Sequence, residues 1–221
     1  MSMIPVTRHG FSVIFAATLA LLVLGAVGSM ATPHVWWVVA LVWIWVISFF
    51  RDPARNIKRQ DNILYAAADG RVTEVTELEH HDLVGGPCHR IRIFLSLFNA
   101  HINRMPCAAE VRSITLKPGK FLAAMRSRAA EENESNTLLV APASPFAGPM
   151  VVRQIAGKVA RTIVCRAGVG QSFQAGQRFG MIKFGSGTEL VVPKQEGLKV
   201  LVKVGDNVKA GLTEMMKLDK I

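Results

Sequence analysis

The chain has 221 residues, 50% of them hydrophobic, which is enough for one domain of ordinary size and a membrane segment. Its 26 Lys and Arg residues outnumber its 16 Asp and Glu residues, and the formal net charge of +10 suits an anionic surface, either nucleic acid or lipid headgroups. The three cysteines, Cys88, Cys107 and Cys165, are widely spaced and form no Cys-x-x-Cys pair. This spacing argues against a disulfide framework and a zinc knuckle, and predicts reduced core cysteines.

Two apolar runs near the start favour lipid over nucleic acid as the anionic partner. Residues 11–30 are 20 uncharged residues, about 30 Å as a helix, which matches the hydrocarbon thickness of a bilayer. Residues 35–50 would reach only about 24 Å, so this second run either crosses a thinned membrane or forms the returning limb of a shallow hairpin. A turn is expected between them, at residues 31–34. A cleaved signal peptide is the alternative, but a second run that carries four tryptophans favours a retained anchor.

Basic residues flank the pair of runs on its outer ends. Arg8 precedes the first run, and the turn between the runs has no Lys or Arg. Four basic residues follow the second run: Arg51, Arg55, Lys58 and Arg59. The positive-inside rule then predicts that both ends face the cytoplasm at the cell (inner) membrane. We expect residues 1–60 to form this anchor with its basic flank and residues 61–221 to form a separate domain on the cytoplasmic face.

From Ile63 onward the sequence consists of short apolar or alternating runs set between Gly, Pro, Asn and Asp, as is typical of strands. The alternation is clearest in residues 90–95. Further strands are expected at residues 111–116, 138–141, 150–155, 159–164, 190–192 and 200–204. Residues 121–132 are the one segment with the apolar spacing of a helix. The predicted fold class is therefore mainly β, a β-sandwich or barrel-like domain that follows an N-terminal hydrophobic helical hairpin.

A Gly-Ser pair, Gly185-Ser186, is the strongest candidate for chemistry. By itself it is most simply part of a turn between two strands. The alternative is self-cleavage, because glycine leaves its carbonyl unshielded and tolerates strained backbone angles, so the hydroxyl of the following serine can attack it. The peptide bond would become an ester, and elimination would leave dehydroalanine at position 186. Hydrolysis of that residue gives a pyruvoyl group.

Six motifs occur along the chain in the order found in a known enzyme family. They are Phe50-Arg51-Asp52-Pro53, Ala68-Asp69-Gly70-Arg71-Val72, the run from Phe94 to Pro106, Asn133-Glu134-Ser135-Asn136, the run from Val152 to Gly157, and the run from Gly180 to Ser186. Together they resemble the short, membrane-anchored branch of the phosphatidylserine decarboxylases.

The resemblance implies a pyruvoyl-dependent enzyme of phospholipid biosynthesis that converts phosphatidylserine to phosphatidylethanolamine and carbon dioxide. It also implies a proenzyme that cuts itself between Gly185 and Ser186 into a large chain, residues 1–185, and a small pyruvoyl chain, residues 186–221. An archaetidylserine decarboxylase would use the same chemistry, because the serine headgroup is shared. The expected partners are an anionic phospholipid membrane, the lipid substrate and the two chains of one precursor, and a homo-oligomer is compatible with the sequence.

The chemistry of decarboxylation selects the cofactor. Loss of the carboxylate leaves a carbanion, which needs an electron sink attached through the substrate amine. A pyruvoyl carbonyl can form a Schiff base with that amine. Pyridoxal phosphate would need a lysine within a phosphate-binding scaffold, and the sequence has no Gly-rich loop that opens a helix. Ser186 is therefore the expected precursor of a covalent pyruvoyl cofactor.

Two further residues are candidates for acid-base work. A histidine at the end of a strand is more often structural, but the resemblance implies that His101 takes part in the proton chemistry of decarboxylation. Asp69 alone is most simply a turn residue before a strand. The resemblance implies that it helps to drive the attack by serine, and a carboxylate paired with His101 would orient the imidazole and stabilise its cation.

The chain departs from the family pattern at three places. Larger members carry a second histidine three residues after the first, where this chain has Arg104, so the base for self-cleavage is left open. Residues 66–68 are alanines where Ser-Pro-Ala is usual, and Leu97 replaces a usual proline. Neither of these last two departures removes a reacting group.

Two other patterns are weaker. A group of histidines with neighbouring ligand types matches no zinc spacing, so we expect a polar loop and no metal. The group is His80, His81, Asp82, Cys88 and His89. The tail from Val202 to Gly211 resembles a biotinyl or lipoyl carrier hairpin, which makes a non-enzymatic, membrane-tethered adaptor the alternative function. Only five residues separate Gly211 from Lys217, which is too short for a carrier hairpin, so Lys217 is expected to be a surface lysine.

Overall fold

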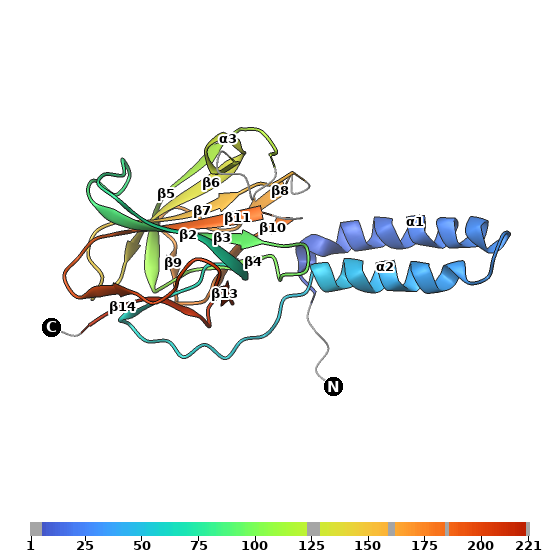
Figure 1. Cartoon of the computed structure of the whole chain (residues 1–221), viewed down its shortest axis with the longest axis horizontal. Helices are drawn as coiled ribbons and strands as arrows, with labels where there is room; N and C mark the ends of the chain where they lie inside the picture. Colours follow the sequence, from blue (N-terminus) through green and yellow to red (C-terminus); the bar gives the residue numbers. More distant parts are fainter. Residues whose placement is uncertain (1–5, 123–128, 159–161, 184–185, 220–221) are drawn as a thin grey trace. The chain divides into compact units, whose positions relative to one another are not determined.

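The computed structural model describes residues 6–122, 129–158, 162–183 and 186–219. The chain divides into two compact units, Met1–Ala54 and Arg55–Ile221. The first unit holds two long helices and the second holds all the strands of the described residues (Figure 1).

The first unit is a helical hairpin. A short 3-10 helix, Arg8–Gly10, leads into α1 (Phe11–Ser29), and α2 (Val35–Phe49) returns beside it. Trp43 Nε1 donates to Thr18 Oγ1 at 2.9 Å, which ties the two helices together. The segment Arg8–Ser29 has a mean hydropathy of 2.4 and is long and apolar enough to cross a membrane. Both helices and the turn between them are as expected, and the second helix is the shorter one.

The second unit is built from antiparallel strands. Their bounds are β1 Ile63–Tyr65, β2 Gly70–Leu78, β3 Cys88–Leu95, β4 Ile102–Arg104, β5 Ala109–Lys117, β6 Ser135–Pro142, β7 Met150–Ile155, β8 Thr162–Cys165, β9 Ser172–Phe173, β10 Arg178–Lys183, β11 Ser186–Pro193, β12 Leu198–Val200, β13 Asn207–Val208 and β14 Glu214–Leu218. One sheet has eight strands in the order β13-β2-β3-β11-β7-β6-β5-β9. Two sheets of three strands have the orders β4-β10-β8 and β1-β14-β12.

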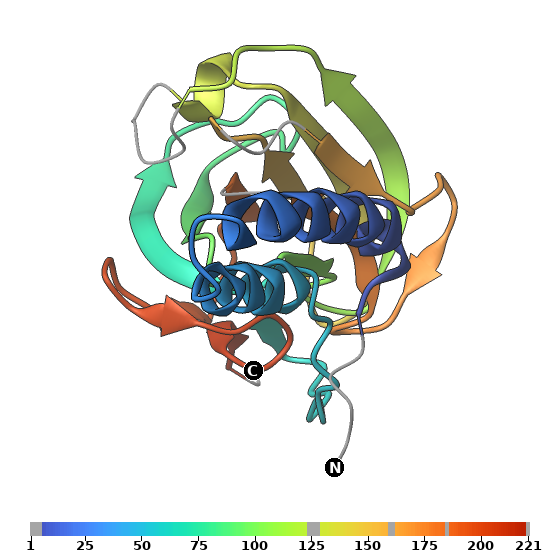
Figure 2. The ribbon, with the colours of Figure 1, turned by 90° about the vertical axis from the view of Figure 1, so that its right-hand side faces the viewer.

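The long sheet curves around the main hydrophobic core (Figure 2). In β3 the buried side chains Ile91, Ile93 and Leu95 alternate with more exposed neighbours, as the sequence predicts. The core adds side chains from β6, β7, β11 and β14. The mainly β fold class is confirmed. In the long sheet, the starts of β2 and β11 lie on either side of the end of β3.

Most of the expected strands are present, but two local predictions are wrong. Residues 201–204 leave the strand because Lys203 N donates to Asp206 Oδ2 in a turn that Gly205 completes with φ of 101°. Residues 121 and 122 are not helical, because the side chain of Asn133 bonds both the N–H and the carbonyl of Leu122. The described part of the expected helix is α3 (Ala129–Glu132). Residues 123–128 and 159–161 lie outside the described residues.

Candidate active site

The candidate residues gather around the end of β3. Strand β11 pairs with β3 so that Ser186 lies opposite Leu95, and β2 pairs on the other side so that Arg71 lies opposite Phe94. Asp69 directly precedes β2. Neighbouring strands lie about 4.8 Å apart, so the backbones at Asp69 and Ser186 are separated by roughly two such spacings. Gly70 permits this packing, because a Cβ atom there would lie 2.1 Å from the carbonyl oxygen of Phe94.

Ser186 is fully buried at the start of β11. Its Oγ has no hydrogen-bond partner among the described residues. A buried hydroxyl normally finds a partner, so an unpaired one needs a functional or structural reason. Gly185, the other half of the expected cleavage site, lies outside the described residues.

His101 is also fully buried, just before β4. Its Nδ1 lies 2.9 Å from the carbonyl oxygen of Asn99. A carbonyl oxygen only accepts hydrogen bonds, so Nδ1 carries the proton and, in the neutral ring, Nε2 carries the basic lone pair. The carbonyl of His101 accepts from Ile182 N at 3.2 Å, which ties the residue to β10. Strand β10 ends at Lys183, three residues before Ser186.

Asp69 is held by two described partners. Its Oδ2 pairs with Arg55 Nη2 at 2.6 Å, and its Oδ1 accepts from Ala210 N at 2.8 Å. Arg55 Nη1 also donates to the carbonyl of Ala210 at 2.5 Å. Arg55 therefore bridges the candidate carboxylate and the segment that follows β13. The sequence analysis included Arg55 only among the basic residues that follow the second apolar run. Its spacing in the sequence does not indicate a contact with Asp69.

Arg104, which occupies the place of the second histidine of larger relatives, is buried. Its backbone N–H donates to the carbonyl oxygen of Ala67 at 2.9 Å, and its Nη1 donates to the carbonyl oxygen of Gly176 at 3.0 Å. Its backbone therefore lies beside the three alanines, residues 66–68, that lead to Asp69.

A row of buried polar side chains crosses the inside of the sheet next to Ser186. Asn103 donates to Thr188 Oγ1 at 3.1 Å, and Gln154 donates to Asn103 Oδ1 at 2.9 Å. Asn136 donates to Gln154 Oε1 at 3.0 Å. Each of the three amides comes from a different one of the sequence motifs, so the motifs meet in space through this row. A hydrogen-bonded row of this kind fixes the register between strands at low dielectric.

The opposite face of the sheet carries a network of charges. Glu189 pairs with Arg92 at 2.6 Å, and Arg92 also pairs with Glu74 at 2.7 Å. Burial alone would raise the pKa of the Glu74 carboxyl, but hydrogen bonds from Arg90 and Thr76 and the charge of Arg92 hold that pKa below its usual value. Glu74 is therefore ionised at neutral pH. A small hollow beside the network is lined by Arg92, Phe94, Ile155 and Gly187, among others.

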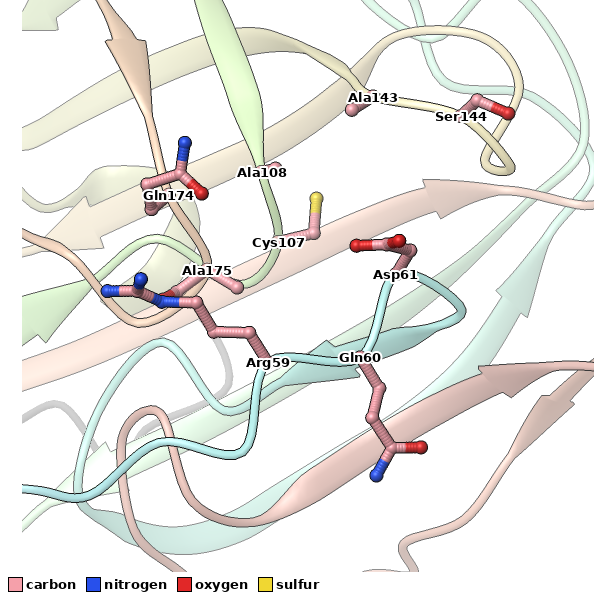
Figure 3. A pocket seen from close by; sticks show the side chains of 9 residues that line it. All are labelled: Arg59, Gln60, Asp61, Cys107, Ala108, Ala143, Ser144, Gln174 and Ala175. Carbon is pink, nitrogen blue, oxygen red and sulfur yellow. The ribbon is translucent and has the colours of Figure 1, made fainter.

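A second hollow involves none of the candidate residues. It is lined by Arg59, Asp61, Cys107 and Gln174, with their neighbours (Figure 3). Burial raises the pKa of the Cys107 thiol to about 12. This thiol stays protonated near neutral pH, so it is not a nucleophile there.

The remaining sequence predictions concern residues away from the end of β3. Cys88 and Cys107 are buried free thiols and Cys165 is half-buried. Cys88 and His89 belong to β3, so placing them in a polar loop is wrong, whereas His80 and Asp82 lie in the turn before it. Within the described ranges, no group of three metal-ligating side chains is found.

Lys217 is exposed and lies within β14, opposite Ile63 and Lys199. A carrier lysine would have to lie on a turn. Its position within a paired strand therefore gives no support to the adaptor alternative.

Comparison with known proteins identifies the family. The family model described as phosphatidylserine decarboxylase matches residues 43–215. The chain belongs to the phosphatidylserine decarboxylase family. It is 42% identical to the phosphatidylserine decarboxylase proenzyme of Magnetococcus marinus over 181 residues, which cover 80% of this chain and 81% of that relative. It is 39% identical to the proenzyme of the same name from Rhodopirellula baltica over 216 residues, covering 95% of this chain and 87% of the relative.

The Arg55 contact gives a test of the expected role of Asp69 in self-cleavage. Replacing Arg55 with alanine removes the partner of Asp69 Oδ2 and is expected to slow self-cleavage by about 10-fold to 100-fold, the kinetic equivalent of one charge-assisted hydrogen bond. The rate is measured as fragment formation after synthesis in a cell-free system. Arg55→Lys keeps the charge but cannot bridge both contacts, so an intermediate rate is expected.

Arg59→Ala is the matched control, because Arg59 is in the same linker and its Nε donates to Ala175 instead. Equal slowing in the Arg55→Ala and Arg59→Ala proteins would show that the linker, and not the contact with Asp69, sets the rate.

Proposed function

We propose that Ser186 is both the nucleophile of self-cleavage and the precursor of a pyruvoyl group in this enzyme. As a member of its family, the chain decarboxylates phosphatidylserine to phosphatidylethanolamine. The observation that carries the assignment of Ser186 is its buried Oγ, which has no hydrogen-bond partner among the described residues. Such a hydroxyl is desolvated and is not held by another described group, so it is available to act as a nucleophile.

The cleavage balances without any further reactant except water. Ser186 Oγ attacks the carbonyl carbon of Gly185, the carbon–nitrogen bond breaks, and the nitrogen of Ser186 takes a proton. Removal of the α-proton of residue 186 then expels the carboxylate of Gly185. Water converts the resulting dehydroalanine to a pyruvoyl group with loss of ammonia.

The residues around position 186 fit such a group. It would occupy the buried start of β11, between the ends of β3 and β7. When bound, a pyruvoyl group supplies a carbonyl that takes up electrons through the substrate amine.

His101 is proposed to handle the proton of decarboxylation. Its Nδ1–H is committed to the carbonyl of Asn99, so Nε2 is the nitrogen that can accept or deliver a proton. Asp69 is proposed to act in maturation. Its carboxylate is held in place by Arg55 and by the backbone of Ala210, and it directly precedes β2, which lies across β3 from the strand that begins at Ser186. A direct pairing of Asp69 with His101 stays a prediction.

The two chains are proposed to remain together after the cut. The first strand of the small chain, β11, is hydrogen-bonded to β3 on one side and to β7 on the other. The same chain also supplies Ala210 N to Asp69. These contacts hold the fragments as one folded unit.

We further propose that residues 1–60 anchor the enzyme in the inner membrane and that the catalytic domain, residues 61–221, faces the cytoplasm. The apolar helix Arg8–Ser29 and the basic residues after α2 support this placement. An enzyme held at this surface meets its lipid substrate by diffusion within the bilayer.

Denaturing mass spectrometry of the purified membrane protein tests the proposal. We expect a chain of residues 1–185 and a fragment of residues 186–221 that lacks a free amino terminus. An active protein that consists only of the uncut chain would refute self-cleavage.

Protease digestion tests the orientation. Added protease should digest the catalytic domain in inverted vesicles and leave it intact in closed spheroplasts. The reverse pattern would refute the cytoplasmic placement.

A further inference from the structure

The turn between β3 and His101 carries an exposed phenylalanine at its tip, beside a half-buried leucine. Asn99 N donates to the carbonyl of Ser96 at 3.0 Å and closes a four-residue turn. Asn99 Oδ1 accepts from both the backbone and the hydroxyl of Ser96, at 2.8 and 2.7 Å. The two central residues are Leu97 and Phe98, and Phe98 is 75% exposed. The polar ends of the turn therefore hold an apolar tip in a defined conformation.

This turn is bonded directly to the candidate site. The carbonyl of Asn99 accepts from the imidazole of His101, and Leu95, just before the turn, is the register partner of Ser186. The apolar tip is thus held by the same residues that position His101 and border Ser186.

The chemistry of the substrate indicates what the tip contacts. Phosphatidylserine keeps its acyl chains in the bilayer, while Ser186 and His101 are both fully buried in the protein. The protein must therefore approach the headgroup closely. Phenylalanine and leucine side chains partition into the boundary between headgroups and acyl chains. Two side chains are far too small a patch for a stable contact with a second protein, which needs about 800 Å² on each partner.

We propose that the Ser96–Asn99 turn inserts Leu97 and Phe98 into the lipid surface and so brings the site to the depth of the serine headgroup. This inference rests on the proposed roles of Ser186 and His101. The positive net charge of the chain adds attraction to an anionic lipid surface. The turn belongs to the second unit, Arg55–Ile221, and not to the unit that contains the helices.

The test compares two substrates on one preparation. The mature full-length enzyme is reconstituted in phosphatidylcholine vesicles, and carbon dioxide release is measured from long-chain phosphatidylserine in the same bilayer and from water-soluble dibutanoyl phosphatidylserine. Phe98→Asp is expected to lower the ratio of the two rates, bilayer over soluble, by at least about tenfold, because a charge replaces an aromatic side chain that partitions into lipid. Phe98→Leu should keep the parent ratio.

The chain offers a matched control in the Gly168–Gln171 turn. There Gln171 N donates to the carbonyl oxygen of Gly168, and Gln171 Oε1 accepts from Gly168 N. This turn is therefore closed by a backbone and a side-chain hydrogen bond, as the Ser96–Asn99 turn is. Val169 at its tip is 68% exposed. Val169→Asp adds the same charge to an equally exposed apolar tip and should leave the ratio unchanged.

Three outcomes would overturn the inference. In the first, Phe98→Asp leaves the ratio unchanged. In the second, it lowers both rates equally, as a distorted site would. In the third, it lowers the ratio and also changes the oligomeric state, which would assign the tip to a protein contact. Normal self-cleavage of each variant shows that it folds, and Phe98→Gln replaces Phe98→Asp if the latter is not cleaved. As a second readout, brominated lipids should quench the additional fluorescence that Phe98→Trp contributes beyond that of the four tryptophans in α2.

The same preparation separates this inference from the proposed function. Full turnover of both substrates by His101→Ala would remove His101 from the mechanism. A selective loss with Phe98→Asp would still establish lipid docking by the turn.

Discussion

Replacing Ser186 by alanine is expected to give a single uncut chain with no measurable decarboxylase activity. The alanine has no hydroxyl to attack Gly185, and position 186 can no longer become a ketone. Removal of the single oxygen atom Oγ therefore abolishes both self-cleavage and formation of the cofactor. Denaturing electrophoresis and carbon dioxide release from phosphatidylserine measure the two effects on the same sample.

Gly187→Ala is the matched control for a change at the start of β11. A Cβ atom at position 187 would meet nothing closer than 3.7 Å, so the strand should accept it and the chain should still be cut. Hydroxylamine added without substrate should inactivate the cut control protein, because it captures a ketone carbonyl. Residual turnover by an uncut Ser186→Ala protein would show that another group supplies the electron sink.

The sequence was sufficient to predict elements that are apolar throughout or that alternate regularly between a buried and an exposed face. The apolar runs that form α1 and α2 have no charged residue. The alternation in β3 follows from one buried face and one face that carries Arg90 and Arg92. Such patterns depend on local periodicity alone, which a single sequence contains.

Contacts between distant residues account for what the sequence did not predict. Arg55 and Asp69 meet only because the linker before β1 runs past the segment that follows β13. The helix prediction at Leu122 failed because a side chain eleven residues later satisfies its backbone groups. Neither contact has a periodic signal, since each depends on how separate segments pack.

The buried amide row is an intermediate case. Asn103, Asn136 and Gln154 were all in motifs that suggested the family, but polar residues in three separate motifs do not show that they bond to one another. The structure joins them to Thr188, two residues after Ser186. The motifs can therefore be understood physically as parts that fix β11 against β4, β6 and β7.

His101→Ala is expected to be cut normally yet to release carbon dioxide about 10²-fold to 10⁴-fold more slowly, the usual contribution of a positioned acid or base. Its buried imidazole has Nδ1 committed to Asn99, so the proton chemistry depends on Nε2 and is lost with the ring. The measurement pairs fragment formation with single-turnover carbon dioxide release.

His89→Ala is the control, because His89 lies near the start of β3, at the end of that strand far from Leu95. Its strand partner in β11 is Val192. Burial lowers the pKa of His89, and Glu77 beside it only partly opposes this, so the ring is largely neutral near pH 7 as a base would be. Its removal should leave turnover unchanged, because no candidate site residue is its strand partner. An uncut His101→Ala protein would move the role of His101 to maturation and leave the decarboxylation base to be found among the other groups at the end of β3. A cut protein with full turnover would exclude His101 from both steps.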